Sequence, residues 1–234
     1  VQIGEQCWFA ENLRTTVYAD GTAIPEVTDQ GTWNWLSSGA RCDYNHNASN
    51  AAFYGRLYNW YAADDPRGLC PSGWHVPSDE EWTNLENYIT SQNFNGTEGT
   101  ALKATSGWIA GGNGTDDFGF SALPGGRRWT GLGFIGAGEY GNWWSTTISG
   151  VPPTMPDTYL IKIRALNTNS ILYEGDLVAR IGMSVRCLGD ADQTEPQGCT
   201  DPGYIEYDAS ATTDDGSCAT LVVEGCTDPA YTEY

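Results

Sequence analysis

Residues 77–90 read PSDEEWTNLENYIT and predict where one helix begins and which side of it is buried. Ser78 suits the N-cap position, and Glu81, three residues later, completes a capping box. Trp82, Leu85 and Ile89 then recur at the spacing of a single helical face. We therefore expect a helix from about Asp79 to Ser91 that packs this face against a core.

The segments around this helix predict the rest of an α+β fold. Residues 54–63, YGRLYNWYAA, place apolar side chains at helical spacing and predict a second helix. Residues 1–18 resemble short strands around a turn, and residues 142–147, 159–165 and 182–188 alternate as half-buried strands do. Helices that are separate in sequence from the strands are typical of an α+β domain with a twisted antiparallel sheet.

Charge is distributed unevenly along the 234 residues. The net charge is −19, and residues 190–234 hold 11 of the 30 acidic residues and none of the 11 Lys and Arg residues. Such an acidic field repels nucleic acid and anionic membrane surfaces and attracts cations. Since no stretch reaches the roughly 18 apolar residues of a membrane span, we expect neither nucleic-acid binding nor membrane insertion.

Seven cysteines are present, and the two histidines, His46 and His75, give little support for a zinc site. We predict the disulfides Cys70–Cys187, Cys7–Cys42 and Cys199–Cys218, which imply an oxidising compartment. The first would close a loop of more than a hundred residues, worth roughly 4–5 kcal/mol in the chain-entropy model. The alternative is a reduced cytosolic protein with buried thiols.

A repeat begins near Gly198. The segment GCTDPGYIEY at 198–207 recurs as GCTDPAYTEY at 225–234, identical at eight of ten positions and 27 residues later. Cys226 opens the second copy, which explains the odd cysteine count. Units this short cannot bury a core alone and depend on a staple such as a disulfide.

Six ordered blocks, IGEQCWFAENLRTT, YGRLYNWYAA, LCPSGWHVPSDEEWTNL, GFSALPGGRR, NWWSTT and SVRCL, carry a family resemblance. Together they resemble the Fibrobacter succinogenes major paralogous domain over about residues 1–189. That domain is similar to the C-type-lectin-like and formylglycine-generating-enzyme group, so the resemblance implies a C-type-lectin-like domain with two helices. Cys7 stands where the family would have an aromatic residue, and a bridge to Cys42 would account for it.

The tail resembles the GCTDP…DDGSC repeats of secreted surface proteins from marine Bacteroidota, often found near a type IX secretion signal. The resemblance implies an exported protein at the extracellular cell surface. We therefore divide the chain into a globular domain (1–189), a linker (190–197), an acidic disulfide repeat (198–224) and the start of a second, truncated repeat (225–234).

A ligand site is expected in the loop-rich second half of the globular domain. Sugars bind to aromatic faces flanked by planar polar side chains, and that combination of residue types occurs there. The candidates are Trp108, Arg127, Trp129, Glu139, Tyr140 and Asn142. For Trp108 and Trp129 the alternative is packing inside the core.

Calcium is a possible cofactor of the tail because oxygen-rich loops bind it. The candidate ligands Asp201, Asp208, Asp214 and Asp215 lie inside one predicted disulfide loop. Their spacing is not that of an EF-hand, and a solvated acidic spacer is the alternative. The pair Asp116–Asp117 is a second, weaker calcium candidate.

The resulting hypothesis is a non-catalytic module of a large surface protein, an adhesin or an appendage component, whose globular domain contacts a glycan or a protein while the repeats act as a stalk. A purely structural subunit that packs against copies of itself or neighbouring domains in a filament is the second hypothesis. A carbohydrate-active enzyme is the third: Asp116 and Asp117 could serve a glycosidase. We expect no enzyme, because His75 is predicted to be a packed or capping residue and His46 lies in an Asn-rich loop.

Overall fold

The computed structural model divides the chain into two units, residues 1–190 and 191–234. The structure describes residues 1–152, 154, 158–169, 171–190, 197–202, 204, 207, 209, 213–214 and 218–220. Each unit is considered separately below.

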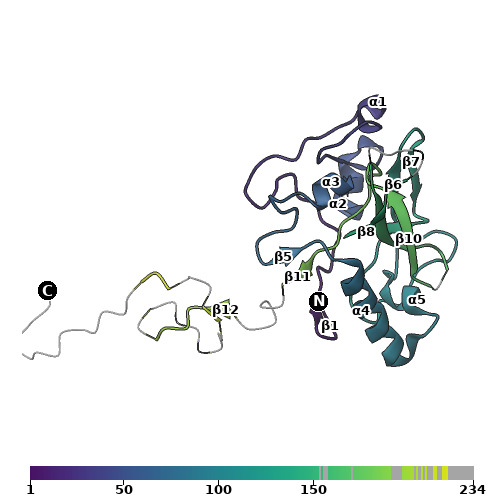
Figure 1. The fold of residues 1–234 in the computed structure, drawn as a ribbon. Helices are drawn as coiled ribbons and strands as arrows, with labels where there is room; N and C mark the ends of the chain where they lie inside the picture. Colours follow the sequence, from purple (N-terminus) through teal and green to yellow (C-terminus); the bar gives the residue numbers. More distant parts are fainter. Residues whose placement is uncertain are drawn as a thin grey trace, which may run out of the picture. The chain divides into compact units, whose positions relative to one another are not determined.

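The first unit mixes short helices with small antiparallel sheets (Figure 1). Its helices are α1 (Gln30–Trp33), α2 (Ala48–Tyr54), α3 (Trp60–Ala63), α4 (Asp79–Ile89) and α5 (Glu98–Leu102), together with the 3₁₀ turn η1 (Tyr44–His46) and the π-helical turn η2 (Thr90–Phe94). Its strands are β1 (Gln2–Ile3), β2 (Gln6–Cys7), β3 (Arg41–Cys42), β4 (Leu57–Tyr58), β5 (Trp74–His75), β6 (Gly125–Trp129), β7 (Gly133–Ala137), β8 (Gly141–Gly150), β9 (Leu160–Leu166), β10 (Tyr173–Val178) and β11 (Leu188–Gly189). The expected α+β class is confirmed at this level.

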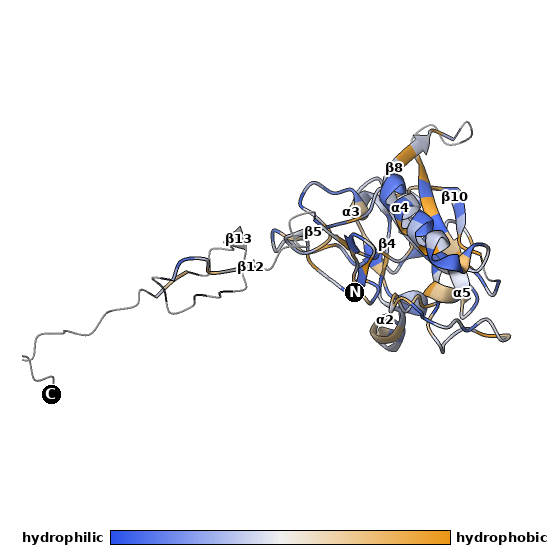
Figure 2. Ribbon diagram, turned by 90° about the horizontal axis from the view of Figure 1, so that it is seen from below, coloured by the Kyte–Doolittle hydropathy of each residue, from blue (hydrophilic) through white to orange (hydrophobic). Residues whose placement is uncertain are grey.

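Helix α4 confirms the prediction from the capping box. The Ser78 hydroxyl accepts from the Glu81 backbone N–H, and the Glu81 carboxylate accepts from the Ser78 backbone N–H. Trp82, Leu85 and Ile89 are fully buried, while the side of α4 that faces the viewer in Figure 2 is largely hydrophilic. The helix ends at Ile89, two residues before the predicted end, and continues as the π-helical turn η2.

The central sheet has the strand order β10–β9–β8, with both pairs antiparallel. Strands β8 and β9 confirm the predicted segments 142–147 and 159–165. The prediction for 182–188 was largely wrong: single bridges at Gly182, Met183 and Ser184 join neighbouring segments, and a regular strand begins only at Leu188. The hairpin β6–β7 and strand β10 were not predicted.

The single helix expected over 54–63 is also wrong. Helix α2 stops at Tyr54 because Gly55 takes a φ of 83°, and a Cβ there would lie 2.6 Å from Cβ of Asn12. Leu57 and Tyr58 pair with β3 instead. Asn59 then caps α3 by accepting from the Ala62 N–H, so the same residues form a helix, a strand and a second helix.

Three buried clusters make up the core of the first unit. Arg128 and Arg186 inside it are also fully buried: Arg128 donates to the carbonyls of Val27 and Thr28, and Arg186 donates to those of Phe9 and Phe120. A buried guanidinium needs many hydrogen-bond acceptors, and here backbone carbonyls of irregular loops supply them. Each of these two arginines therefore links loops to the core.

Two of the three predicted disulfides are confirmed, namely Cys70–Cys187 and Cys199–Cys218. The third is wrong, because Cys7 and Cys42 are free thiols. Cys7 pairs with Gln2 in the hairpin β1–β2, whereas Cys42 is buried in β3 among Trp33, Tyr44 and Leu57. The two residues thus belong to different parts of the unit, and burial raises the pKa of the Cys42 thiol to about 12.

The second unit is described only in part. Strands β12 (Gln197–Gly198) and β13 (Thr213–Asp214) form a short parallel pair. Inside the loop closed by the Cys199–Cys218 disulfide, the backbones of Cys199 and Tyr207 form an isolated parallel β-bridge. The predicted second repeat at 225–234, including Cys226, lies outside the described residues.

Candidate functional site

Arg127, in the middle of β6, is the centre of the predicted ligand site. Its guanidinium carbon lies 4.7 Å from the ring centroid of Trp129 and 5.8 Å from that of Tyr140. Its Nη1 donates to Oδ1 of Asn142 over 3.2 Å. Four of the six predicted residues are therefore brought together, with a cation between two aromatic rings. Burial lowers the pKa of Arg127, although the group stays fully charged in the neutral range.

Glycines in the β6–β7 hairpin make this arrangement possible. Gly136 takes a φ of 78°, and a Cβ there would lie 2.5 Å from Cδ2 of Tyr140. The Tyr140 N–H donates to the Gly136 carbonyl over 2.8 Å. The Tyr140 ring thus lies directly on the hairpin backbone, which fixes its orientation, while 39% of the residue stays exposed.

Tyr140 and Glu139 line a surface hollow of about 220 Å³, the Tyr140 hollow. Its lining consists of Ile109, Ala110, Glu139, Tyr140, Asn167 and Thr168. Ile109 is 48% exposed, and Glu139 also reaches solvent. The hollow is smaller than the roughly 300–1,000 Å³ of a drug-sized site. A small polar ring would fit this volume. The groups around it are an aromatic face, an aliphatic side chain, a carboxylate and a hydroxyl.

Two predicted site residues have other roles. Trp108 is only 5% exposed, packs in the same cluster as Trp82 and Phe120, and donates from Nε1 to the Ala122 carbonyl over 2.9 Å. It is a core residue, which corrects the expectation that it faces a ligand. Asn142 is fully buried, so it holds Arg127 in place and does not reach the surface.

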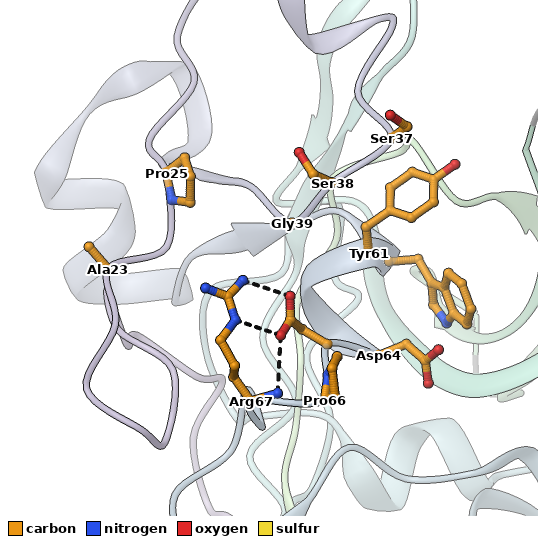
Figure 3. A pocket seen from close by; sticks show the side chains of 11 residues that line it. Ala23, Pro25, Ser37, Ser38, Gly39, Tyr61, Asp64, Pro66 and Arg67 are labelled. Atoms are coloured by element: carbon orange, nitrogen blue, oxygen red, sulfur yellow. Dashed lines mark hydrogen bonds and ion pairs between the residues drawn. The ribbon is translucent and has the colours of Figure 1, made fainter.

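A second surface cavity, which the sequence did not predict, lies between residues 23–39 and 60–67. It has a volume of about 410 Å³ and is called the Asp64 pocket here. Figure 3 shows several of its lining residues: Ala23, Pro25, Ser37, Ser38, Gly39, Tyr61, Asp64, Pro66 and Arg67. Trp60 and Asp65 complete the lining. Its polar and aromatic residues come from two segments that are distant in sequence, so no local pattern could reveal it.

His75 is bonded on both sides. Its Nε2 lies 2.9 Å from Oε1 of Glu81 and its Nδ1 lies 2.6 Å from Oδ1 of Asp190. The hydrogen bond to Glu81, together with that to Asp190, raises the pKa of His75 to about 8. Burial raises the pKa of Glu81, but hydrogen bonds from His75 and Ser78 outweigh it and lower this pKa to about 2. With both ring nitrogens bonded to carboxylates, His75 is ion-paired in this structure, whereas the sequence predicted a packed or capping residue.

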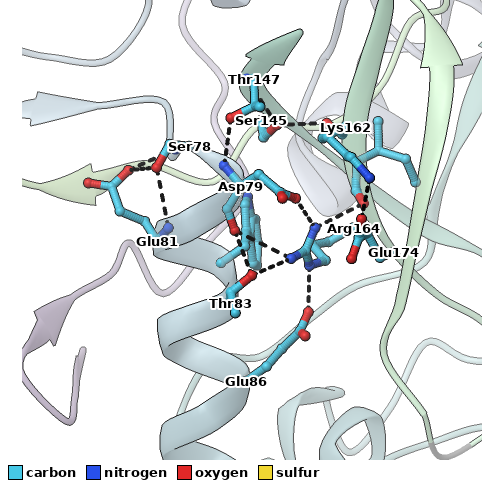
Figure 4. Close-up of polar contacts among 12 residues, drawn as sticks. Ser78, Asp79, Glu81, Thr83, Glu86, Ser145, Thr147, Lys162, Arg164 and Glu174 are labelled. Atoms are coloured by element: carbon cyan, nitrogen blue, oxygen red, sulfur yellow. Dashed lines mark hydrogen bonds and ion pairs between the residues drawn. The ribbon is translucent and has the colours of Figure 1, made fainter. Parts of the chain in front are cut away.

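The start of α4 is also joined to the central sheet by an ion pair cluster (Figure 4). The Arg164 guanidinium on β9 lies 2.5 Å from Asp79 and 2.5 Å from Glu86, and it donates to the Thr83 hydroxyl over 3.0 Å. The Arg164 side chain is 1% exposed. Burial lowers its pKa, but the two carboxylates outweigh this effect and raise the pKa above its ordinary value. The cluster fixes α4 on the sheet and contacts neither surface hollow.

The remaining acidic candidates do not converge in the part of the chain that is described. Asp116 accepts from the backbone and hydroxyl of Ser121, and Asp117 accepts from the Thr115 hydroxyl. Asp201 is exposed, the side chain of Asp214 is not described, and Asp208 and Asp215 lie outside the described residues. Within the described ranges no group of three or more His, Cys, Asp or Glu side chains could hold a metal ion.

Three comparisons with known proteins complete the description. The family model of the Fibrobacter succinogenes major domain matches residues 1–188, which agrees with the resemblance found in the sequence. No curated protein and no solved structure matches the chain. Among the described helices, none has the length and apolar character needed to span a bilayer.

Proposed function

The chain belongs to the Fibrobacter succinogenes major domain family, and we propose that it is a non-catalytic ligand-binding module of a secreted cell-surface protein. In this proposal residues 1–189 contact a glycan, and the acidic disulfide repeats act as a stalk that binds calcium. The whole protein would serve as an adhesin or a component of a surface appendage.

The observation that supports glycan binding is the arrangement at the Tyr140 hollow. The Tyr140 ring lies against Gly136 and near the Arg127 guanidinium, so it loses little entropy on binding. Glu139 and Thr168 stand at the same hollow with groups that can accept and donate hydrogen bonds. A rigid aromatic face beside such polar groups suits one sugar ring, with C–H groups on the tyrosine and hydroxyls on the polar side chains.

A glycan array probed with the intact chain tests this proposal. We expect binding to a subset of glycans, and we expect Tyr140→Ala to weaken the best of them by about tenfold or more, which corresponds to about 1.4 kcal/mol. Glu139→Gln should weaken it as well. Trp35→Ala is the matched control, because Trp35 is 76% exposed and lies outside the hollow. Equal losses in Trp35→Ala and Tyr140→Ala would contradict a site at Tyr140.

A purely structural role in a filament is the second candidate, and one observation favours it. Trp35 and Leu132 are 76% and 74% exposed. The segments that carry them are joined, because Oδ1 of Asn34 accepts from the Gly131 N–H over 2.9 Å. Large exposed apolar side chains on joined segments are typical of a protein interface. Sedimentation separates the two candidates: assembly that Leu132→Ser and Trp35→Ala abolish, in the absence of glycan, supports the filament.

We also propose that residues 1–189 adopt the C-type-lectin-like arrangement. The support is the GWHVPSDEEW block, which begins α4, and the covalent link of Cys70, just before it, to Cys187 in the closing segment SVRC. An experimental structure whose strand order does not match that group would refute this assignment.

A further inference from the structure

Lys103 is a buried lysine whose charge is met by backbone carbonyls. The residue is 1% exposed, and within the described ranges its ammonium has no carboxylate as an ion-pair partner. Its Nζ instead donates to the carbonyls of Asn167, Thr168 and Asn169 over 3.2, 3.4 and 2.8 Å. A charged amine has three N–H groups and a neutral amine has only two, so three acceptors match the charged form. Burial lowers the pKa of Lys103, and these carbonyls oppose that effect.

The position of the ammonium is fixed from the side of the core. Lys103 directly follows α5, where its N–H donates to the Gly99 carbonyl over 3.0 Å, and it forms an isolated bridge with Ala122. Its Nζ lies 5.1 Å from the ring centroid of Trp108, which is itself a core residue. The charge is therefore held by the core, whereas the three carbonyls belong to the turn 167–169 that follows β9.

The same turn supplies one wall of the Tyr140 hollow. Asn167 and Thr168 line the hollow, and Thr168 is exposed. The Asn169 N–H donates to Oδ1 of Asn167 over 2.7 Å, so the turn also has a hydrogen bond of its own. A Cβ at Gly112 would lie 2.9 Å from Cγ2 of Thr168, which shows how closely the neighbouring loop packs on it. The place of the Thr168 side chain thus depends on a turn whose three successive carbonyls are directed at one charge.

We propose that Lys103 is a positioning residue of the Tyr140 hollow, and that its ammonium occupies a cation site built from the three carbonyls of the turn 167–169. The negative ends of these carbonyl dipoles converge, and they repel one another unless a positive charge lies between them. The tethered ammonium thereby holds Thr168 at the hollow. The consequence for sugar binding rests on the proposed function, whereas the cation site itself does not.

Two variants separate the charge of Lys103 from its bulk. Lys103→Met keeps a long apolar side chain without the charge, and Lys103→Ala removes the equivalent of one n-propylammonium ion. In both we expect amide hydrogen exchange at Asn167, Thr168 and Asn169 to accelerate by about tenfold or more, with less than about a twofold change in α4. Added n-propylammonium should restore protection to Lys103→Ala in a saturable manner, whereas the neutral analogue 1-propanol should not.

Lys162→Met is the matched control. Lys162 is the other lysine of the chain, its substitution changes the net charge by the same amount, and it pairs with Glu174 at the surface. It should leave exchange in the turn 167–169 within about twofold of the unmodified chain. In the unmodified chain, NMR should show the Lys103 ammonium protons in slow exchange with water and those of Lys162 in fast exchange. Fast exchange at Lys103 would contradict the cation site without any variant.

The outcomes distinguish this inference from the proposed function. Unchanged exchange of the turn in both Lys103 variants, failure of n-propylammonium to restore it, or equal restoration by 1-propanol would overturn the cation site. Lys103→Met should also weaken the best array glycan by about threefold or more. A turn that loosens while glycan affinity stays the same would refute the positioning role. If no glycan binds the unmodified chain, the proposed function fails, while the exchange and rescue measurements still decide the cation site.

Discussion

Nδ1 of His75 lies 2.6 Å from Oδ1 of Asp190, the last residue of the globular unit. The other ring nitrogen contacts Glu81, which itself caps α4. Strand β11, just before Asp190, pairs with β5, which contains His75. The end of the globular unit is therefore fixed to the start of α4 through one titratable ring.

This relationship predicts a pH window for stability. The pKa of His75 is raised to about 8, so its contribution is complete below pH 6.5 and is lost as the pH rises through about 8. The pKa of Glu81 is lowered to about 2, so its contribution is complete above pH 4.5 and is lost as the pH falls towards 2. Both side chains are about a third exposed, so screening limits each loss to about 1 kcal/mol or less.

Urea unfolding between pH 4 and 9 measures this effect. We expect the unmodified chain to lose stability above pH 6.5 and His75→Gln to remove that alkaline decline. His46→Gln is the control, because burial lowers the pKa of His46, whereas the alkaline decline is assigned to a histidine whose pKa is raised. An alkaline decline that persists unchanged in His75→Gln would refute the assignment.

The Cys70–Cys187 disulfide should dominate the stability of the globular unit. It joins residues 117 positions apart, and the chain-entropy model gives about 4–5 kcal/mol for such a loop. We expect the double variant Cys70→Ala/Cys187→Ala to lose about that free energy of unfolding. Cys7→Ser should lose much less, since Cys7 carries no bridge and is half-buried. Peptide mapping after alkylation of the unfolded chain without reductant should modify Cys7 and Cys42 and leave the four bridged cysteines unmodified; a linked Cys7–Cys42 peptide would contradict the structure.

Arg164 and Lys162 lie two residues apart on β9 and form ion pairs in different surroundings. Arg164→Ala removes the partner of two partly buried carboxylates, and we expect a loss of about 3–5 kcal/mol of unfolding free energy. Lys162→Ala breaks a surface pair with Glu174 that solvent screens, so the loss of stability should be much smaller. Comparable losses in the two variants, measured by chemical denaturation, would be inconsistent with a buried cluster at Arg164.

Trp108 and Tyr140 are expected to contribute to different properties, Trp108 to the stability of the unit and Tyr140 to glycan binding. Trp108→Ala removes a buried ring and should destabilise the unit by about 3–5 kcal/mol. Tyr140→Ala removes a ring that is 39% exposed, so its effect on unfolding should be no more than about 1–2 kcal/mol while its effect on glycan affinity is large. Thermal unfolding and glycan binding measured on the same samples provide the test. A Trp108→Ala variant that is as stable as the unmodified chain would contradict the assignment of Trp108 to the core.

Calcium binding by the tail is tested by hydrogen exchange of residues 199–207 in the full chain. If Asp201, Asp208, Asp214 and Asp215 bind calcium, a chelator should increase exchange in this segment, and added calcium should restore protection. Hydrogen exchange that is identical with calcium and with the chelator would contradict calcium binding by the tail.

What the sequence could predict was mainly local. The capping box of α4 depends on residues three positions apart, and the alternation in β8 and β9 is likewise a local signal. The apolar spacing over 54–63 predicted a helix that does not form. Gly55 ends the preceding helix with a positive φ, and the spacing of apolar residues contains no information about that backbone angle. The β6–β7 hairpin was missed because Gly126, Gly133 and Gly136, all at positive φ, replace the alternating side chains of an ordinary strand.

Residue types predicted the composition of the ligand site better than its exposure. Arg127, Trp129 and Tyr140 do come together, because the turn after β7 places Tyr140 beside β6. The glycines around Trp108 suggested a surface loop, yet its ring packs against Ala122 and the α4 cluster. The Asp64 pocket is lined by two segments that come together only in the folded chain, so no local sequence pattern could predict it.

The central claim is that the Tyr140 hollow receives a glycan. Titration of the best array glycan into the isotopically labelled full chain, followed by backbone NMR, tests it most directly. We predict saturable shifts concentrated at Ile109, Glu139, Tyr140 and Thr168, with Trp35 and Leu132 unchanged. Shifts confined to Trp35 and Leu132, or no shift at saturating glycan, would contradict it.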